Sequence, residues 1–111
     1  MPCNLSYLHR MSGGDKNFVA EMIRLFLKQA PDELLKLQQA LADENVETVR
    51  QTVHKLKSSV AMIGAENMVS KLKLMETKLA AGADCMVFWE AFNILEKEFT
   101  EVKKELEPML Q

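Results

Sequence analysis

The chain has 111 residues, of which 48% are hydrophobic and 27% charged, and its formal net charge is −2. This length suits one domain around a single hydrophobic core, and so small a net charge gives no reason to expect nucleic acid or an anionic membrane as a partner. No apolar run approaches the roughly 20 residues of a membrane span, and the N-terminus lacks the pattern of a signal peptide. Cys3 and Cys85 show no motif spacing, which indicates free thiols in a reducing compartment. We therefore expect a cytoplasmic location.

The first half of the chain predicts a short helix followed by a long one. Residues 5–11 can form the short helix, which ends at Ser12-Gly13-Gly14. Asp15 is suited to cap the next helix, because its carboxylate can accept from free backbone N–H groups. Pro31 removes a backbone donor, yet the apolar stripe resumes after it. We predict one bent helix over 15–42, with two helices meeting at Pro31 as the alternative. Its apolar stripe holds Phe18, Met22 and Leu25, flanked by Val19, Ile23 and Phe26, and later Leu34, Leu37 and Leu41.

The second half of the chain predicts three more amphipathic helices, over 46–63, 65–81 and 84–107. Apolar residues recur there in steps of three and four, which is the period of a helix buried on one side. The breaks fall at Asp43-Glu44-Asn45, at Gly64 and near Gly82, and Asp84 can cap the last helix. Four substantial helices with short connections indicate an antiparallel bundle. The predicted fold is all-α: an up-down-up-down four-helix bundle with a short extra N-terminal helix, forming a single domain over 1–111.

The helix predicted over 46–63 carries a histidine away from its apolar stripe. On a helical wheel His54 lies roughly 135° from the centre of that stripe. Arg50, Lys55 and Lys57 lie near it, and no carboxylate occurs between Thr48 and Ala65. The sequence thus predicts a local charge of +3 around one exposed imidazole. The small residues Ser58 and Ala61 share this surface.

An exposed imidazole among cations suits phosphoryl transfer. Neutral imidazole is a good nucleophile, and neighbouring cations favour its neutral form. Once a phosphoryl group is attached, the same cations can stabilise its negative charge. Small side chains beside the ring let a second protein bring its reactive group close. A surface histidine near lysines is also common on helix faces that only contact solvent, so this pattern alone leaves both interpretations open.

The order of residues around His54 resembles the signature of histidine phosphotransfer (HPt) domains, H-x-L-K-G-S-S followed by G-A. The matching residues are His54, Leu56, Lys57, Ser59, Gly64 and Ala65, and the resemblance covers nearly the whole chain. Ser58 stands where the family most often has glycine, and its hydroxyl can hydrogen-bond the imidazole or phosphoryl oxygens. The resemblance implies that His54 is the phosphoacceptor, through Nε2, and that Lys57 stabilises the phosphate. Arg50 is a further candidate for that role, from the wheel alone.

The resemblance also implies the partners. A receiver domain carries the phosphoryl group on an aspartate and holds Mg²⁺ in its own acidic pocket; His54 takes the group and passes it to another receiver. We therefore expect no cofactor, ATP site, kinase activity or metal site in this chain, and a monomer, either free-standing or part of a hybrid sensor histidine kinase. Docking is expected around Lys55, Met62, Ser58 and Ala61, with Ser59 and Gly64 as further small residues near the histidine. Met62 can equally cover a neighbouring helix. His9 lacks an accompanying lysine and is interpreted as structural.

Two other functions are compatible with a helical bundle. One is an adaptor without covalent chemistry, whose partner binding would not depend on His54. The other is the dimerisation and phosphoacceptor domain of a sensor kinase. That class typically follows its histidine with an acidic residue and soon a proline, whereas Lys55 follows here and the next proline is Pro108.

Overall fold

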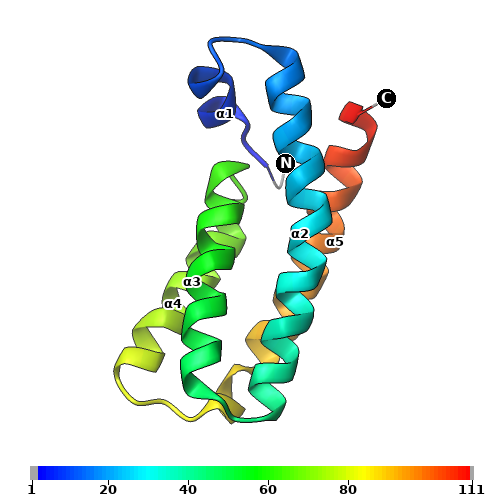
Figure 1. The fold of residues 1–111 in the computed structure, drawn as a ribbon. Coiled ribbons are helices and arrows are strands. Elements are labelled where there is room, and N and C mark those ends of the chain that lie inside the picture. Colours follow the sequence, from blue (N-terminus) through cyan, green and yellow to red (C-terminus); the bar gives the residue numbers. More distant parts are fainter. Residues whose placement is uncertain (1–2, 111) are drawn as a thin grey trace.

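The computed structural model describes residues 3–110, which contain helices and no strand. Four long helices lie antiparallel in a bundle with principal extents of 43 × 21 × 21 Å, and α1 packs across one end (Figure 1). The predicted all-α fold is therefore confirmed. The helices are α1 (Ser6–Met11), α2 (Lys16–Ala42), α3 (Val46–Met62), α4 (Glu66–Ala80) and α5 (Trp89–Leu106), with the 3₁₀ turns η1 (Cys85–Phe88) and η2 (Glu107–Leu110) on either side of α5.

The long helix α2 begins at its predicted cap and runs through Pro31. The Asp15 carboxylate accepts hydrogen bonds from the backbone N–H groups of Asn17 and Phe18, which satisfies donors that have no partner inside the helix. Pro31 lies on the exposed side, so the carbonyl that its missing N–H leaves free can be solvated. The alternative of two separate helices is wrong.

The buried stripe of α2 is the one that flanks the predicted stripe. Val19, Ile23 and Phe26 are buried, whereas Phe18 and Leu25 are 37% and 43% exposed. Both sets recur at helical spacing, and only the packing of α2 against α3 and α5 decides between them. The outcome leaves apolar side chains of α2 on the surface of the bundle.

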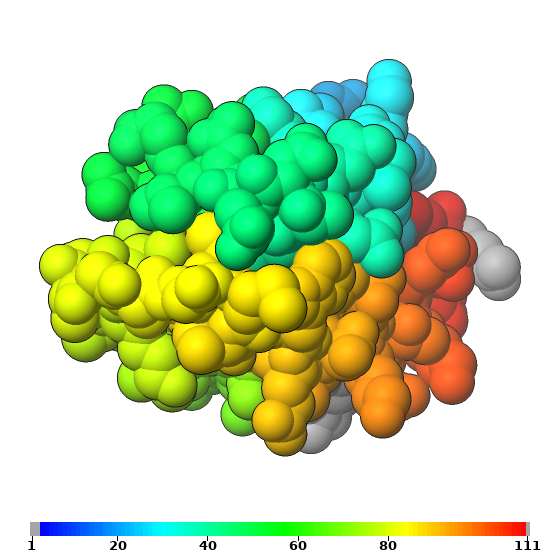
Figure 2. All heavy atoms as spheres, turned by 90° about the horizontal axis from the view of Figure 1, so that it is seen from below, coloured from blue at the N-terminus to red at the C-terminus, as the bar shows by residue number. Residues whose placement is uncertain are grey.

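The lower end of the bundle holds the two connections that turn the chain around (Figure 2). Asn45 caps α3 by accepting from the N–H of Thr48, and Asp84 accepts from the N–H of Met86. The segment predicted as one helix over 84–107 is divided, since the Asp84 cap is followed by η1 before α5 begins. Buried Phe88 of η1 joins the core.

The upper end is closed by the N-terminal segment, which packs on the α3–α4 turn. The backbone N–H of Asn4 is 3.2 Å from the carbonyl oxygens of both Ile63 and Gly64. Gly64 has a φ of +69°, and a Cβ atom placed there would lie 1.9 Å from the carbonyl oxygen of Asn4. Only glycine fits this turn, because any side chain would both strain the backbone and displace the segment that covers it.

Both cysteines are free thiols, as the sequence predicts. Burial, together with the nearby charge of Glu105, raises the pKa of the Cys3 thiol to about 12. The Glu105 carboxylate also accepts a hydrogen bond from the Cys3 backbone N–H. Burial also raises the pKa of Cys85. Both thiols are therefore protonated at neutral pH and poor nucleophiles.

Candidate functional site

The α3 helix holds His54 on the surface by burying the residues beside it. Val53 and Leu56 are fully buried, which fixes the rotation of α3 about its axis. His54 is then turned outward, with 68% of its side chain exposed. The imidazole stands on a rigid helix in the middle of the bundle, where a second protein can reach it.

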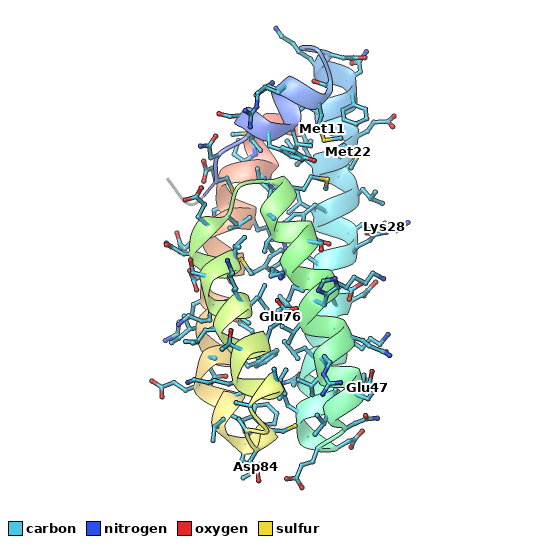
Figure 3. The ribbon with its side chains drawn as sticks, turned by 90° about the vertical axis from the view of Figure 1, so that its left-hand side faces the viewer. Met11, Met22, Lys28, Glu47, Glu76 and Asp84 are labelled. Carbon is cyan, nitrogen blue, oxygen red and sulfur yellow. The ribbon has the colours of Figure 1, made fainter. Side chains whose placement is uncertain are left out.

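A glutamate from the neighbouring helix contacts the imidazole. Nδ1 of His54 is 3.0 Å from Oε2 of Glu76, which lies on α4 at mid-height of the bundle (Figure 3). Glu76 is the more protected partner, since only 24% of its side chain is exposed. The contact joins residues 22 positions apart in sequence and ties the ring to a second helix.

The same carboxylate also binds the lysine of the motif. Nζ of Lys57 is 2.5 Å from Oε1 of Glu76. The Lys57 ammonium, which donates this hydrogen bond, lowers the pKa of Glu76 below its ordinary value of 4.5; partial burial opposes the shift, and the hydrogen bond with His54 adds to it. Glu76 is therefore a carboxylate at neutral pH, with one oxygen for each partner.

The ionised glutamate determines which ring nitrogen is free. A carboxylate only accepts hydrogen bonds, so Nδ1 of a neutral His54 must carry the proton that it donates to Glu76. Nε2 then holds the lone pair. Because the ring is largely exposed, this nitrogen is available as a nucleophile.

The predicted excess of positive charge around His54 is wrong. The three cations near His54 each pair with a carboxylate, and all three carboxylates come from outside the segment 48–65. Arg50 pairs with Glu47 at 3.1 Å, and Lys55 pairs with Glu33 of α2 at 3.0 Å. Lys57 alone among them shares its carboxylate with the histidine, which favours Lys57 over Arg50 as the cation for a phosphoryl group.

The small residues near His54 leave open space on one side of it. Ser58 and Ala61 are exposed on the same surface of α3. The Ser58 hydroxyl donates to the backbone carbonyl of His54 at 3.3 Å and not to the ring. The hydroxyl of half-buried Ser59 donates to the backbone carbonyl of Lys55 at 3.2 Å. Both hydroxyls are thus bonded to their own helix, and Ser58 acts here through its small size.

Two predicted site residues lie away from the imidazole. Gly64 is in the α3–α4 turn, ten residues and about 15 Å along the chain from His54. Its contact there is with Asn4, so its geometry is explained by the turn. Met62 is half-buried and packs against the core, two turns from His54, with part of its side chain still accessible.

Glu76 is the site residue that the sequence analysis missed. The position of Glu76 could have been inferred from the antiparallel pairing of α3 and α4. With the turn near Gly64, antiparallel α3 and α4 place residues at equal distances from the turn side by side, because both rise about 1.5 Å per residue. His54 is ten residues before Gly64 and Glu76 twelve after it. A carboxylate beside the histidine could therefore be found by counting across the turn.

Comparison with known proteins identifies the family. A model of the Hpt domain family matches residues 21–107, and the chain therefore belongs to this family of histidine phosphotransfer domains. The structure is similar to that of the HPt domain of a hybrid sensor histidine kinase from Shewanella, with a TM-score of 0.83 and 21% sequence identity over 98% of this chain and 93% of that one. No curated protein matches the sequence. The resemblance inferred from the residues around His54 is thus confirmed.

Residues 3–110 lack two features that would indicate other kinds of site. Within residues 3–110, no helix is both long and apolar enough to cross a membrane. The same residues contain no cluster of three or more histidine, cysteine, aspartate or glutamate side chains arranged to hold a metal ion.

Proposed function

We propose that this domain is a histidine phosphocarrier: His54 accepts a phosphoryl group from the aspartyl phosphate of one receiver domain and gives it to the aspartate of another. The observation that carries the proposal is the contact of His54 Nδ1 with Glu76, which leaves Nε2 free on an exposed helix surface. Membership of the Hpt family supports the same role.

The transfer step follows from this geometry. Nε2 attacks phosphorus in line, a P–N bond forms, and the P–O bond to the receiver aspartate breaks with its electrons remaining on that carboxylate. The ring gains positive charge as the new bond forms, while Nδ1–H stays hydrogen-bonded to Glu76. The carboxylate stabilises the charge that develops on the imidazole, and it holds the ring in orientation, which is the main contribution a protein makes to such transfers.

Lys57 stabilises the phosphoryl group once it is on the ring. In the free domain its ammonium pairs with Glu76. A phosphoryl group on Nε2 brings negative charge near the same ammonium, which lies one turn along the helix from His54. Lys57 can then donate to the phosphoryl oxygens while Glu76 keeps the ring.

The receiver docks on a surface formed by α3 and α2. The pair Lys55–Glu33 fixes the register of these antiparallel helices. Seven residues after Lys55 in α3 is Met62, and seven residues before Glu33 in α2 is the neighbour of Leu25, so Met62 and Leu25 lie at about the same level. Exposed Leu25 and half-buried Met22 thus extend the surface of α3, and Met11 of α1 lies at the same end of the bundle as Met22 (Figure 3). We call the following residues the docking surface: His54, Lys55, Ser58, Ala61 and Met62 of α3 with Met22 and Leu25 of α2.

The partners are receiver domains, each of which supplies the Mg²⁺ and the acidic pocket for the reaction. The transfer unit is one chain with one receiver, because a single copy carries His54, Lys57 and Glu76 together. The domain itself needs no ATP and no metal. We place it in the cytoplasm, either free-standing or joined to a hybrid sensor histidine kinase.

Phosphoryl transfer from phosphorylated receiver domains tests the proposal. The wild-type domain is expected to gain a label that is labile in acid and stable in alkali, and His54→Gln is expected to gain none. Lys57→Ala should still be labelled, more slowly by about tenfold, because it loses one charge-assisted hydrogen bond. If a broad panel of receivers labels neither wild type nor variant while both are folded, the carrier function is wrong and an adaptor function takes its place.

A further inference from the structure

A second apolar surface lies between α4 and α5, away from His54. Two adjoining hollows of about 400 and 180 Å³ run along this groove. Leu74 of α4 and Val87 of η1 are 53% and 57% exposed there, and half-buried Ile94 of α5 lines both hollows. We call these residues, with Ala91, the α4–α5 groove.

The groove and the phosphoacceptor site use opposite flanks of α4. At about 100° per residue, Glu76 lies on the flank that faces α3, whereas Lys71, Leu74 and Lys78 share the flank that faces α5. His54 belongs to α3, which contributes no residue to the groove. A protein bound in the groove therefore leaves His54 accessible.

The two edges of the groove carry opposite charges. Lys71 and Lys78 lie on the α4 edge, and Glu98 and Glu90 lie on the α5 edge. Lys71 and Glu98 line one hollow and are at one level, and Lys78 and Glu90 line the other hollow at the next level. None of these four charges forms an ion pair within residues 3–110. Oε1 of Glu98 is shielded from solvent and accepts no hydrogen bond within that part of the chain.

We propose that the α4–α5 groove binds the same groove of a second copy of this chain, in a parallel dimer whose two-fold axis runs along the groove. In that arrangement α4 of each copy faces α5 of the other at the same level. Lys71 then meets the glutamate at 98 of the second copy, Lys78 meets the one at 90, and symmetry repeats both pairs. Leu74 of each copy then faces Ile94 of the other at the same level, and the exposed apolar side chains of the groove, Leu74 and Val87, are removed from water.

Charge selects this arrangement over the other face-to-face dimer. A two-fold axis running across the groove would place α4 against α4, so that Lys71 would oppose Lys78 and the glutamates would oppose each other. Like charges in contact strongly disfavour an interface. The parallel dimer is the one in which all four charges of each copy find opposite partners.

The dimer is expected to be weak. Along α4 the groove runs from Asn67 to Lys78, about 17 Å of helix, which places the interface at the small end of protein–protein contacts. We expect a dissociation constant on the order of 10⁻⁴ M. This replaces the monomer implied by the family resemblance with a concentration-dependent equilibrium.

Sedimentation equilibrium from about 10 µM to about 1 mM tests the proposal, with circular dichroism to check the fold. Wild type should dimerise. Two double variants, Lys71→Glu/Lys78→Glu and Glu90→Lys/Glu98→Lys, reverse the charge of one edge. Each should raise the dissociation constant of the dimer by at least about tenfold. An equimolar mixture of the two variants should recover it, since the acidic groove of one then faces the basic groove of the other.

The control makes the same change in net charge elsewhere. Arg24→Glu/Lys28→Glu alters exposed residues of α2 outside the groove and should dimerise like wild type. A wild-type protein that stays monomeric to about 1 mM overturns the proposal and leaves the groove to a different partner. A dimer that resists both groove variants, or that the control disrupts equally, overturns it as well.

Discussion

At the scale of single residues, the site depends on one carboxylate with two partners. Glu76 accepts from His54 Nδ1 through one oxygen and from Lys57 through the other. The two partners have different tasks in the proposed transfer, since the histidine carries the phosphoryl group and the lysine neutralises it. Glu76 therefore positions both groups without touching the phosphorus.

Replacing Glu76 tests this positioning role. In Glu76→Ala the ring loses the acceptor that keeps the proton on Nδ1, and we expect the rate of single-turnover transfer from a receiver to fall by about tenfold, the worth of a hydrogen bond to a charged group. Glu76→Gln keeps an acceptor and should recover part of the rate. NMR of the imidazole nitrogens should show the Nδ1–H tautomer in wild type and a mixture in Glu76→Ala. A purely structural role for Glu76 would change stability while leaving the tautomer and the rate unaltered.

The shifted pKa of Glu76 predicts a dependence of stability on pH. The pKa of this carboxyl in the folded protein is below its ordinary value of 4.5, so its contribution is present above the unfolded pKa and is lost as the pH falls through the folded pKa. Glu76→Gln should be less stable than wild type at pH 7, by about 1 kcal/mol. The difference should shrink below about pH 4.5. Urea denaturation at a series of pH values measures it, and a difference that stays constant down to pH 3 would contradict the assignment.

The sequence was informative about His54 and uninformative about its partner. The histidine lies outside the apolar stripe of its own helix, and the neighbouring motif residues are adjacent in sequence. Glu76 and Glu33 are not, because each reaches the site from another helix. Their distance from His54 depends on the register of packed helices, which a single-helix wheel does not contain.

At the scale of helices, the caps and periods were readable but the side buried by α2 was not. Asp15 caps α2 as predicted, since capping is a local interaction, whereas Asp84 caps η1 and not the long helix α5 that follows it. In α2 two adjacent stripes are apolar, and burial of Val19 and Ile23 leaves Phe18 and Leu25 outside. The difference is a rotation about the helix axis, and tertiary packing sets it.

The α3–α4 turn yields a prediction that separates fold from function. Gly64→Ala should destabilise the domain by about 2–3 kcal/mol, because φ at this position is +69° and the new Cβ would collide with the Asn4 carbonyl. Transfer to His54 in the folded variant should stay within about twofold of wild type, since the turn lies about 15 Å along the helix from the ring. Thermal denaturation and a transfer assay below the transition measure the two effects.

Gly82→Ala is the matched control for this turn. Gly82 also has a positive φ, +85°, but nothing lies within 4 Å of the position of its Cβ. Gly82→Ala should therefore lower the free energy of unfolding only by the backbone strain, about 1 kcal/mol. Equal losses in the two variants would show that the contact with Asn4 contributes nothing, and a large loss of transfer in Gly64→Ala would assign the glycine to the site.

At the scale of the whole molecule, the bundle presents different chemistry on different sides. The α2–α3 side carries the exposed imidazole of His54 and exposed apolar residues, the α4–α5 side carries an apolar groove with charged edges, and the upper end is closed by the N-terminal segment. Four helices in a ring leave each pair of neighbours one external groove. A domain of this size can thus accept a receiver on one side while the opposite flank of α4 contacts another protein.

Leu25 is the residue at which docking on the α2–α3 side can be tested. Leu25→Glu places a charge on the docking surface. The rate of transfer at low receiver concentration should fall by about tenfold, because apolar burial is lost and a charge is desolvated on binding. The rate at saturating receiver concentration should change much less. Leu35→Glu is its control, because Leu35 is a comparably exposed leucine of the same helix, 53% against 43%, that lies in the groove toward α5. Stopped-flow transfer over a range of receiver concentrations measures both. Equal effects of the two variants would mean that the receiver does not bind across α2 and α3, and the docking surface would then have to lie on the α4 side of His54, around Glu76.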